Sequence, residues 1–439
     1  MQFSRRTTPI LFAGLVLVFV LTAAIPFKTY AQDDIGPVLA QMLAEARYGQ
    51  ARALLSQTLG DRPDAALHLA HLEGVIAMRQ GRMQEAIAVF RALLAIKPDF
   101  IPARVELAHA LRLSGAYDAA FHHYELLAEG GVHPALRQMA TGALNAMRAE
   151  RPYGASVRFS VVPSSNFNKG SGQETFEAGD LVFSIDEASR AKSGVGIAFG
   201  TTAFNTFTLT DTNSITASVD ADVTKYAEGA EADFAALEGS LAFTTRGDNL
   251  TFAVGPVAEH QWSNWEPYLA RYGVRSQASV PLGPRDIVTA SFEALAQDYA
   301  EADYRDGSRL TGTIALKHAL SPAASISISA GGTLERTQRP HLDHNDFVVG
   351  MVLRNEWDGG LITSLFGSYE HHNYLGDYPG VGEPRNDHRI SVGTTLSHRD
   401  LNIAGFMPQI TYRYSRQISN VSFFDYDSHD VSLSLTQNF

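Results

Sequence analysis

Hydrophobic and polar positions follow two different periods along the chain, and the change falls close to residue 150. From about Asp34 to Glu150 the apolar residues, mostly Ala and Leu, recur with helical spacing. From Ala155 onwards apolar and small polar residues alternate, as in SISISA at 325–330. An alternation with period two places successive side chains on opposite faces of a strand. The pattern therefore predicts a helical region followed by a β region.

The helical region repeats itself with a shift of 34 residues. Segments 81–100 and 115–134 align at this shift, so that Gly81 recurs as Gly115. A period of this length resembles tetratricopeptide repeats, and about three units are present. A bundle of unrelated helices would show helical periodicity without the 34-residue register, so the register favours the repeats.

Such repeats stack into a superhelix with a concave face that binds partners. By register, this face would carry three histidines and two arginines: His68, His71, Arg79, His109 and Arg112. We expect the five residues to contact a client protein. For each of them taken singly, an ordinary solvated position is the simpler interpretation.

The β region contains about fourteen alternating segments between Ala155 and Phe439, roughly one per 20 residues, as membrane barrels do. A soluble sandwich also alternates, so the lengths of the connections decide. The short connections are 247–249, 282–285, 321–322 and 358–360. The long ones are 164–193, 299–307, 338–346 and 375–386. Short and long connections alternate, as in outer-membrane barrels. Connections 205–213 and 399–407 are exceptions, because they lie on the side of the short connections but are longer than these.

The expected fold class is a multidomain α + β chain, with a periplasmic α-solenoid of tetratricopeptide type before a transmembrane antiparallel β-barrel of about 14 strands. Glu293 and Arg413 lie on the polar faces of their strands, which indicates a wet interior. The chain stops inside an alternating segment, and we expect Phe439 to end the strand that closes the barrel.

The N-terminus has the pattern of a secretory signal peptide. Arg5 and Arg6 precede an apolar run from Ile10 to Ile25, and Thr29 and Ala31 stand at the small-residue positions of a cleavage site. A permanent membrane anchor is the alternative. The expected domains are therefore a signal peptide at 1–31, helical repeats at 32–150 and the barrel at 151–439.

Composition excludes several classes of chemistry. The sequence has no cysteine, which excludes disulfides, thiol catalysis, cysteine-ligated metals and a lipid anchor on a processed cysteine. The formal net charge is -12, which disfavours nucleic acid as a partner.

No catalytic constellation stands out, so no enzyme activity and no cofactor are expected. HLDHND contains His341, Asp343, His344 and Asp346, which could ligate a divalent metal. The segment lies in a predicted outer loop without a second supporting cluster, so a solvated loop is the favoured interpretation and no metal site is predicted.

Several segments resemble the surface lipoprotein assembly modulator family, also described as the type XI secretion outer-membrane protein. They are the predicted first strand and its exit (161–172), the second strand (188–200), the entry to a late strand at Arg385 and Asp387, and the final hairpin (405–439). The resemblance covers nearly the whole chain after the signal, and the final hairpin is its most specific part.

The resemblance implies a translocator in the Gram-negative outer membrane that delivers a client, either a surface lipoprotein or a secreted soluble protein, to the cell surface. The repeats would dock the client in the periplasm, and the barrel would provide the passage. The implied partners are this client, the barrel-assembly machinery during insertion and outer-membrane lipid.

Two alternatives remain open. An exopolysaccharide exporter also combines repeats with a barrel, but generally has longer repeat arrays. A tryptophan-lined lumen would favour sugar, whereas Trp262 and Trp265 fall in a predicted outer loop and Trp357 at a strand end. A passive porin would leave the repeats without a role.

Overall fold

The computed structural model describes residues 35–439, apart from 130–131, 179–180, 228, 230–231, 248, 284, 322 and 400. The chain forms two compact units, the first ending at Gly60 and the second running from Asp61 to Phe439. The expected signal peptide, 1–31, lies outside the described residues.

The first unit contains helices α1 (Gly36–Ala44) and α2 (Tyr48–Leu59), which pack against each other. Pro37 stands in the first turn of α1, where its missing N–H removes no helical hydrogen bond. Helix α2 ends at Gly60, whose φ of 52° is a conformation that glycine adopts without strain.

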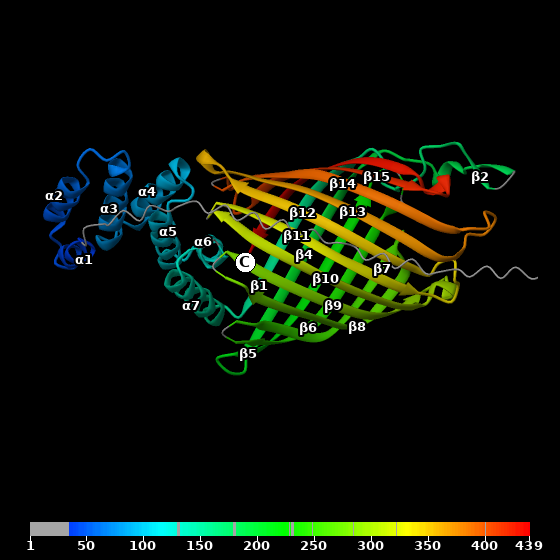
Figure 1. The fold of residues 1–439 in the computed structure, drawn as a ribbon, viewed down its shortest axis with the longest axis horizontal. Coiled ribbons are helices and arrows are strands. Elements are labelled where there is room, and N and C mark those ends of the chain that lie inside the picture. Colours follow the sequence, from blue (N-terminus) through cyan, green and yellow to red (C-terminus); the bar gives the residue numbers. More distant parts are fainter. Residues whose placement is uncertain are drawn as a thin grey trace, which may run out of the picture. The chain divides into compact units, whose positions relative to one another are not determined.

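The second unit begins with five helices joined by short turns (Figure 1): α3 (Ala65–Arg79), α4 (Met83–Ile96), α5 (Ile101–Leu113), α6 (Tyr117–Glu129) and α7 (Pro134–Glu150). Consecutive helices pack against each other. The turns after α3 and α5 contain Gly81 and Gly115, with φ of 76° and 81°. A side chain is strained in this left-handed conformation, which explains why the 34-residue register keeps glycine at this point.

The core of these helices is close-packed around fully buried apolar side chains: Phe90, Leu94, Leu107, Leu111 and Leu127. Gly74 lets α4 approach α3, because a Cβ atom at Gly74 would lie 2.5 Å from Cε1 of Phe90. None of the helices in the described part of the chain is long and apolar enough to cross a membrane.

Among the described residues, fourteen strands form a closed antiparallel barrel (Figure 1). They are β1 (Tyr153–Ser164), β4 (Gly194–Thr208), β5 (Asn213–Tyr226), β6 (Phe234–Arg246), β7 (Thr251–Ser263), β8 (Glu266–Pro281), β9 (Asp286–Tyr299), β10 (Gly307–Ser321), β11 (Ala324–Arg336), β12 (His344–Glu356), β13 (Leu361–Asp377), β14 (Pro384–His398), β15 (Met407–Ser419) and β16 (Tyr426–Asn438). Strands β2 (Thr175–Ala178) and β3 (Leu181–Ser184) form a separate hairpin. The expected fold class, with fourteen barrel strands, is confirmed.

The last strand closes the barrel, as the ending of the sequence predicts. Strand β16 pairs with β15 on one side and with β1 on the other. Beyond its last paired residue, Phe439 exchanges two backbone hydrogen bonds with Ala155, at N–O distances of 2.7 and 3.2 Å. The C-terminus is therefore held at the end of the barrel at which β1 begins.

Several strands extend further than the sequence pattern predicts. The predicted connection 205–213 shrinks to 209–212, and 375–386 shrinks to 378–383. His344 and Asp346, placed in a loop by the sequence, belong to β12, and Trp262 belongs to β7. The start of β12 carries polar side chains on both faces, since Asn345 alternates with His344 and Asp346, so the apolar alternation that marks a strand in lipid is missing there.

The two faces of the barrel differ in polarity. Phe159 and Val161 on β1 and Leu433 on β16 point outwards and are exposed in the isolated chain. Between them Ser160 and Ser434 face inwards, with their hydroxyl oxygens 2.8 Å apart. An apolar outer surface over a closed ring of strands suits lipid, because closure leaves no strand with an unpaired edge.

Candidate functional site

Charged side chains from neighbouring strands form ion pairs along the inner wall of the barrel. On β8, Arg275 donates from Nη1 to Glu238 on β6 at 2.7 Å and from Nε to Glu293 on β9 at 2.7 Å. Four residues earlier on the same face of β8, Arg271 lies 3.3 Å from Glu259 on β7. These side chains line an inner cavity of about 190 Å³. The inner wall therefore carries positive and negative side chains side by side.

Further pairs continue this wall. Arg309 on β10 lies 3.1 Å from Glu335 on β11, and Arg389 on β14 pairs with Glu370 on β13. Most of these groups keep part of their surface in contact with solvent. Partly hydrated pairs of this kind form a polar, wet interior rather than a tight pocket for one small ligand.

The first outer connection is tied to the closing strand. Asn166 is almost fully buried, and its Nδ2 donates to the carbonyl oxygens of Gly170 and Asp427. Lys169 donates to Asp430 of β16 at 2.8 Å. The connection therefore bridges the outer ends of β1 and β16.

Strand β1 pairs with β16 over fewer residues than it does with β4. Seven residue pairs join β1 to β16, whereas twelve join β1 to β4. The pairing is interrupted at Val162 and Pro163, with the same register on either side, and proline has no N–H to donate to a ladder. The loop contacts at Asn166 and Lys169 thus supplement the weakest ladder of the closed sheet.

The motif residues Arg385 and Asp387 meet the final hairpin at the outer end of β14. The guanidinium of Arg385 donates to both carboxylate oxygens of Asp387, at 2.5 to 3.0 Å, and its carbon lies 3.4 Å from the ring centroid of Phe424. Asn420 accepts a hydrogen bond from the backbone N–H of Asn386 at 2.7 Å. Two of the four segments that carry the family resemblance are therefore in direct contact.

The five residues predicted for client docking all lie on α3 and α5, which contact each other. Arg79 and His109 are exposed. Both lie close enough to Glu106 to favour its charged form, although burial raises the pKa of that carboxyl overall. Arg112 is bound to Glu150 at the end of α7. Arg79 and His109 therefore remain the most accessible members of this set.

The other two members of the set are engaged with aromatic rings. His68 meets Phe100 edge to face at a centroid distance of 5.3 Å. His71 packs against Phe90 and Phe100, and its Nε2 is buried without a hydrogen-bond partner in the described part of the chain. Burial lowers the pKa of His71 to about 4, so this imidazole is neutral at pH 7. Its placement favours a packing role.

A buried ionic cluster that sequence reasoning missed joins α5 to the barrel. Arg104 on α5 has no exposed surface, and its Nη2 lies 3.3 Å from Oε2 of Glu356, the last residue of β12. Glu356 also pairs with Arg399, which follows β14. Arg104 donates in addition to the carbonyl oxygen of Pro98. A buried arginine is costly unless it is paired, so this cluster holds helix and strand together.

Two histidines of α6 lie beside the cluster. His123 is buried, and its Nδ1 lies 3.4 Å from Nη1 of Arg104. Burial, followed by the positive charge of Arg104, lowers the pKa of His123 well below its ordinary value. Burial likewise lowers the pKa of His122, to about 4. Both imidazoles are therefore neutral at pH 7, which avoids a further positive charge next to Arg104.

A closed barrel with an apolar outer face and a charged lumen, preceded by helical repeats, defines an outer-membrane β-barrel protein with its N-terminal repeat region in the periplasm. The sequence matches the family described as surface lipoprotein assembly modifier over residues 154–439, and the chain belongs to this family. Residues 77–129 match the tetratricopeptide repeat.

The relatives span both regions. Surface lipoprotein assembly modifier 1 of Haemophilus influenzae is 21% identical over 378 residues, which is 84% of this chain and 76% of that protein. Surface lipoprotein assembly modifier 1 of Neisseria meningitidis is 22% identical over 392 residues, 84% of this chain and 75% of that protein. Among solved structures, the outer membrane protein OprD from Pseudomonas aeruginosa aligns with 66% of this chain and 93% of its own, at 9% identity and a TM-score of 0.32. A likeness this low carries no functional weight.

Proposed function

We propose that this protein delivers a lipoprotein client from the periplasm to the cell surface, with the helical repeats docking the client and the barrel providing the passage. The family match over 154–439 is the observation that carries the proposal, because relatives of this family are named for the assembly of surface lipoproteins. A secreted soluble protein is the alternative client of the same route.

The helices support the docking step. Arg79 on α3 and His109 on α5 are exposed on two adjoining helices, next to the acidic Glu106. Repeat proteins bind partners over such extended surfaces rather than in a closed pocket. The surface formed by Arg79 and His109 is the docking face that we propose for the client.

The barrel supports the passage step. Its wall carries paired charges, such as Arg275 with Glu238 and Glu293, which hydrate a lumen without binding one ligand tightly. The short β1–β16 ladder is a second route, because a seam with few paired residues opens at lower cost than its neighbours. Both routes are compatible with the barrel geometry.

The buried cluster around Glu356 links the two steps. Arg104 comes from the helices and Arg399 from the barrel, and both pair with Glu356. A buried pair of this kind has a demanding geometry and therefore fixes one arrangement of α5 against the end of β12. A client held by the helices would thus be presented at a defined position of the barrel rim.

A polysaccharide exporter is the second candidate from the sequence, and the tryptophans do not favour it. Trp262 lies on β7 with the opposite parity to Glu259, hence on the outer face, and Trp265 donates to Asp233 in an outer turn. Neither offers an aromatic platform inside the lumen on which a sugar ring could stack.

Surface display of lipoproteins tests the proposal. Intact cells with and without the gene are shaved with protease, and the released lipoproteins are quantified by mass spectrometry. We expect at least one lipoprotein to disappear from the surface in the deletion strain while it persists in the periplasm. Unchanged surface display of every lipoprotein would overturn the proposal.

A charge reversal then tests the docking face. We expect Arg79→Glu combined with His109→Glu to reduce client display, while the barrel still migrates as a folded species on unheated gels. The matched control is Gln84→Glu with Lys97→Glu, at exposed positions on or just after α4. If the Arg79/His109 variant displays the client as the wild type does, docking occurs on another surface.

A further inference from the structure

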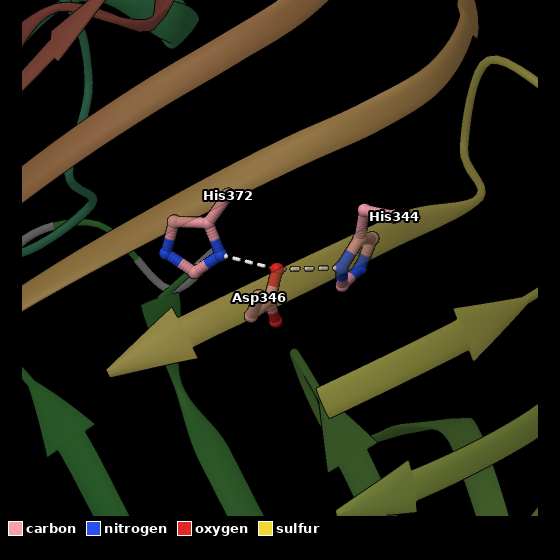
Figure 2. Close-up of side chains that lie close together, drawn as sticks. All are labelled: His344, Asp346 and His372. Carbon is pink, nitrogen blue, oxygen red and sulfur yellow. Dashed lines mark hydrogen bonds and ion pairs between the residues drawn. The ribbon is translucent and has the colours of Figure 1, made fainter. Parts of the chain in front are cut away.

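Two histidines and an aspartate meet on the inner wall of the barrel, towards its outer end (Figure 2). Nδ1 of His344 lies 2.8 Å from Oδ1 of Asp346, and Nδ1 of His372 lies 2.9 Å from the same oxygen. One ligand atom from each residue lies within 4.8 Å of those of the other two. All three side chains are largely buried, with 13 to 19% of their surface exposed.

The strand geometry brings these groups together. His344 and Asp346 are two residues apart on β12, so both point to the same face, opposite to the exposed Phe347. Asp346 is the direct cross-strand partner of His372 on β13. Side chains of such partners are close neighbours on one face of a sheet. The convergence is thus fixed by register and not by a mobile loop.

Two further carboxylates face the outer nitrogens of the imidazoles. Nε2 of His344 lies 3.7 Å from Oε2 of Glu335, and Nε2 of His372 lies 3.7 Å from Oε2 of Glu370. Histidine that binds a metal through one nitrogen usually has a carboxylate at the other, which fixes the tautomer and orients the ring. Both histidines of this cluster have that arrangement.

We propose that His344, Asp346 and His372 bind one divalent transition-metal ion of the Zn²⁺ class. Two imidazole nitrogens and one carboxylate oxygen are the donor set of three-ligand zinc sites, in which the fourth position is left open. Magnesium and calcium favour sites built from oxygen ligands alone. The ion would join β12 to β13 near the outer end of the barrel and turn its open position to the lumen.

The charges around the site suit a cation. A bound metal requires both imidazoles to be neutral, and Asp346 then gives the three ligands one negative charge. Glu335 and Glu370 are each paired with an arginine, Arg309 and Arg389 respectively, so they do not repel Asp346 strongly. When the metal occupies Nδ1 of a histidine, the ring proton lies on Nε2, directly opposite Glu335 or Glu370.

The test is a metal titration of the full-length protein in detergent, purified through a tag without histidines and stripped with a chelator. We expect one Zn²⁺ to be retained per chain after dialysis. With Co²⁺ as a probe, we expect the visible absorption band of a four-coordinate site. The absence of saturable Zn²⁺ binding would overturn the proposal, and the cluster would then be a hydrogen-bonded His–Asp–His triad.

Variants separate this site from adventitious binding. We expect His344→Ala, His372→Ala and the nearly isosteric Asp346→Asn each to abolish retention of Zn²⁺. His371→Ala is the matched control, because His371 is adjacent in sequence but stacks on His388 on the other face of β13. Glu335→Gln and Glu370→Gln should weaken affinity by roughly 10–100-fold, the usual effect of losing such a carboxylate. Mobility of unheated samples on gels shows that each barrel is folded.

The result is clear in either direction. Zn²⁺ binding that survives in folded His344→Ala and His372→Ala barrels, or that is lost equally in His371→Ala, would place the metal elsewhere and overturn the assignment.

Discussion

Nη2 of Arg104 lies 3.3 Å from Oε2 of Glu356, and both side chains are buried although 252 residues separate them in the sequence. One residue belongs to helix α5 and the other ends strand β12. Because Arg399 shares the same carboxylate, Glu356 balances two guanidinium groups. Glu356 is thus the shared partner of both arginines where α5 meets β12, beside other contacts such as the hydrogen bond from Arg137 of α7 to the carbonyl oxygen of Gly283.

Removal of this carboxylate should be more harmful than removal of either arginine. We expect Glu356→Gln to lower the free energy of unfolding of the helices by about 3–5 kcal/mol, because it leaves buried charge unpaired. Arg104→Met should cost less, since Arg399 still pairs with Glu356. Urea titration followed by far-ultraviolet circular dichroism measures both.

The control for this pair is Arg158→Met in the lumen. Arg158 pairs with Asp222 while about half of each side chain is exposed, so its loss should cost less than about 1 kcal/mol. An Arg104→Met protein that is less stable than Glu356→Gln would contradict the shared role of Glu356.

The helices should lose stability in mild acid. The pKa of His122 is lowered to about 4 by burial, and that of His123 is also lowered, whereas an unfolded histidine titrates near pH 6.5. Between these values the unfolded state binds more protons, so stability is complete above about pH 6.5 and declines as the pH falls towards 4. The slope should be about 1.4 kcal/mol per pH unit for each histidine.

Thermal unfolding at pH 7 and pH 5 measures this dependence. His122→Gln should reduce the slope by the share of one histidine, about 1.4 kcal/mol per pH unit, because His71 and His123 still contribute. His109→Gln, at an exposed position, should leave it unchanged. Equal pH dependence in the wild type and His122→Gln would show that other groups govern acid sensitivity.

The close approach of α3 and α4 should tolerate no side chain at Gly74. A methyl group there would meet three ring atoms of the fully buried Phe90 at 2.5 to 3.0 Å. We expect Gly74→Ala to destabilise the helices by about 1–3 kcal/mol through overpacking. Gly142→Ala on α7 is the control, since it meets nothing within 4 Å and should stabilise by up to about 1 kcal/mol. The same circular-dichroism titration measures both variants, and equal effects would contradict the packing of α3 on α4.

The seam between β1 and β16 can be tested with cysteines, because the chain has none of its own. Ser160 and Ser434 are register partners on the inner face, so Ser160→Cys with Ser434→Cys should form a disulfide on oxidation. Ser160→Cys with Leu435→Cys should not, because Leu435 points outwards. Gel mobility after oxidation distinguishes them, and the reverse result would contradict the register.

The sequence predicts the fold in those regions where one local pattern repeats. The 34-residue register indicates the helices through Gly81 and Gly115, and the alternation around Phe159 and Leu433 indicates strands with one face in lipid. The alternation does not predict that polar strand ends such as His344–Asp346 belong to a strand, because both faces of a strand are polar outside the lipid.

The candidate sites are predicted less well, because they join residues that are distant in the sequence. Arg104 gives no local sign that it is buried against Glu356, since charged residues on helices are usually solvated. The pairing of Asp346 with His372 depends on the length of the turn between β12 and β13 and on the strand register. The sequence analysis considered His344 and Asp346 as metal ligands but favoured a solvated loop, because nothing in the sequence links them to His372 on the next strand.

Capture of the client is the most direct measurement of the proposed function. The tagged protein is purified from detergent-solubilised outer membranes, next to the Arg79→Glu/His109→Glu variant, and the bound material is identified by mass spectrometry. Our proposal predicts one dominant lipoprotein, bound by the wild type, depleted in the variant and missing from the surface of deletion cells. Bound glycan without a protein partner would contradict it and favour a polysaccharide exporter.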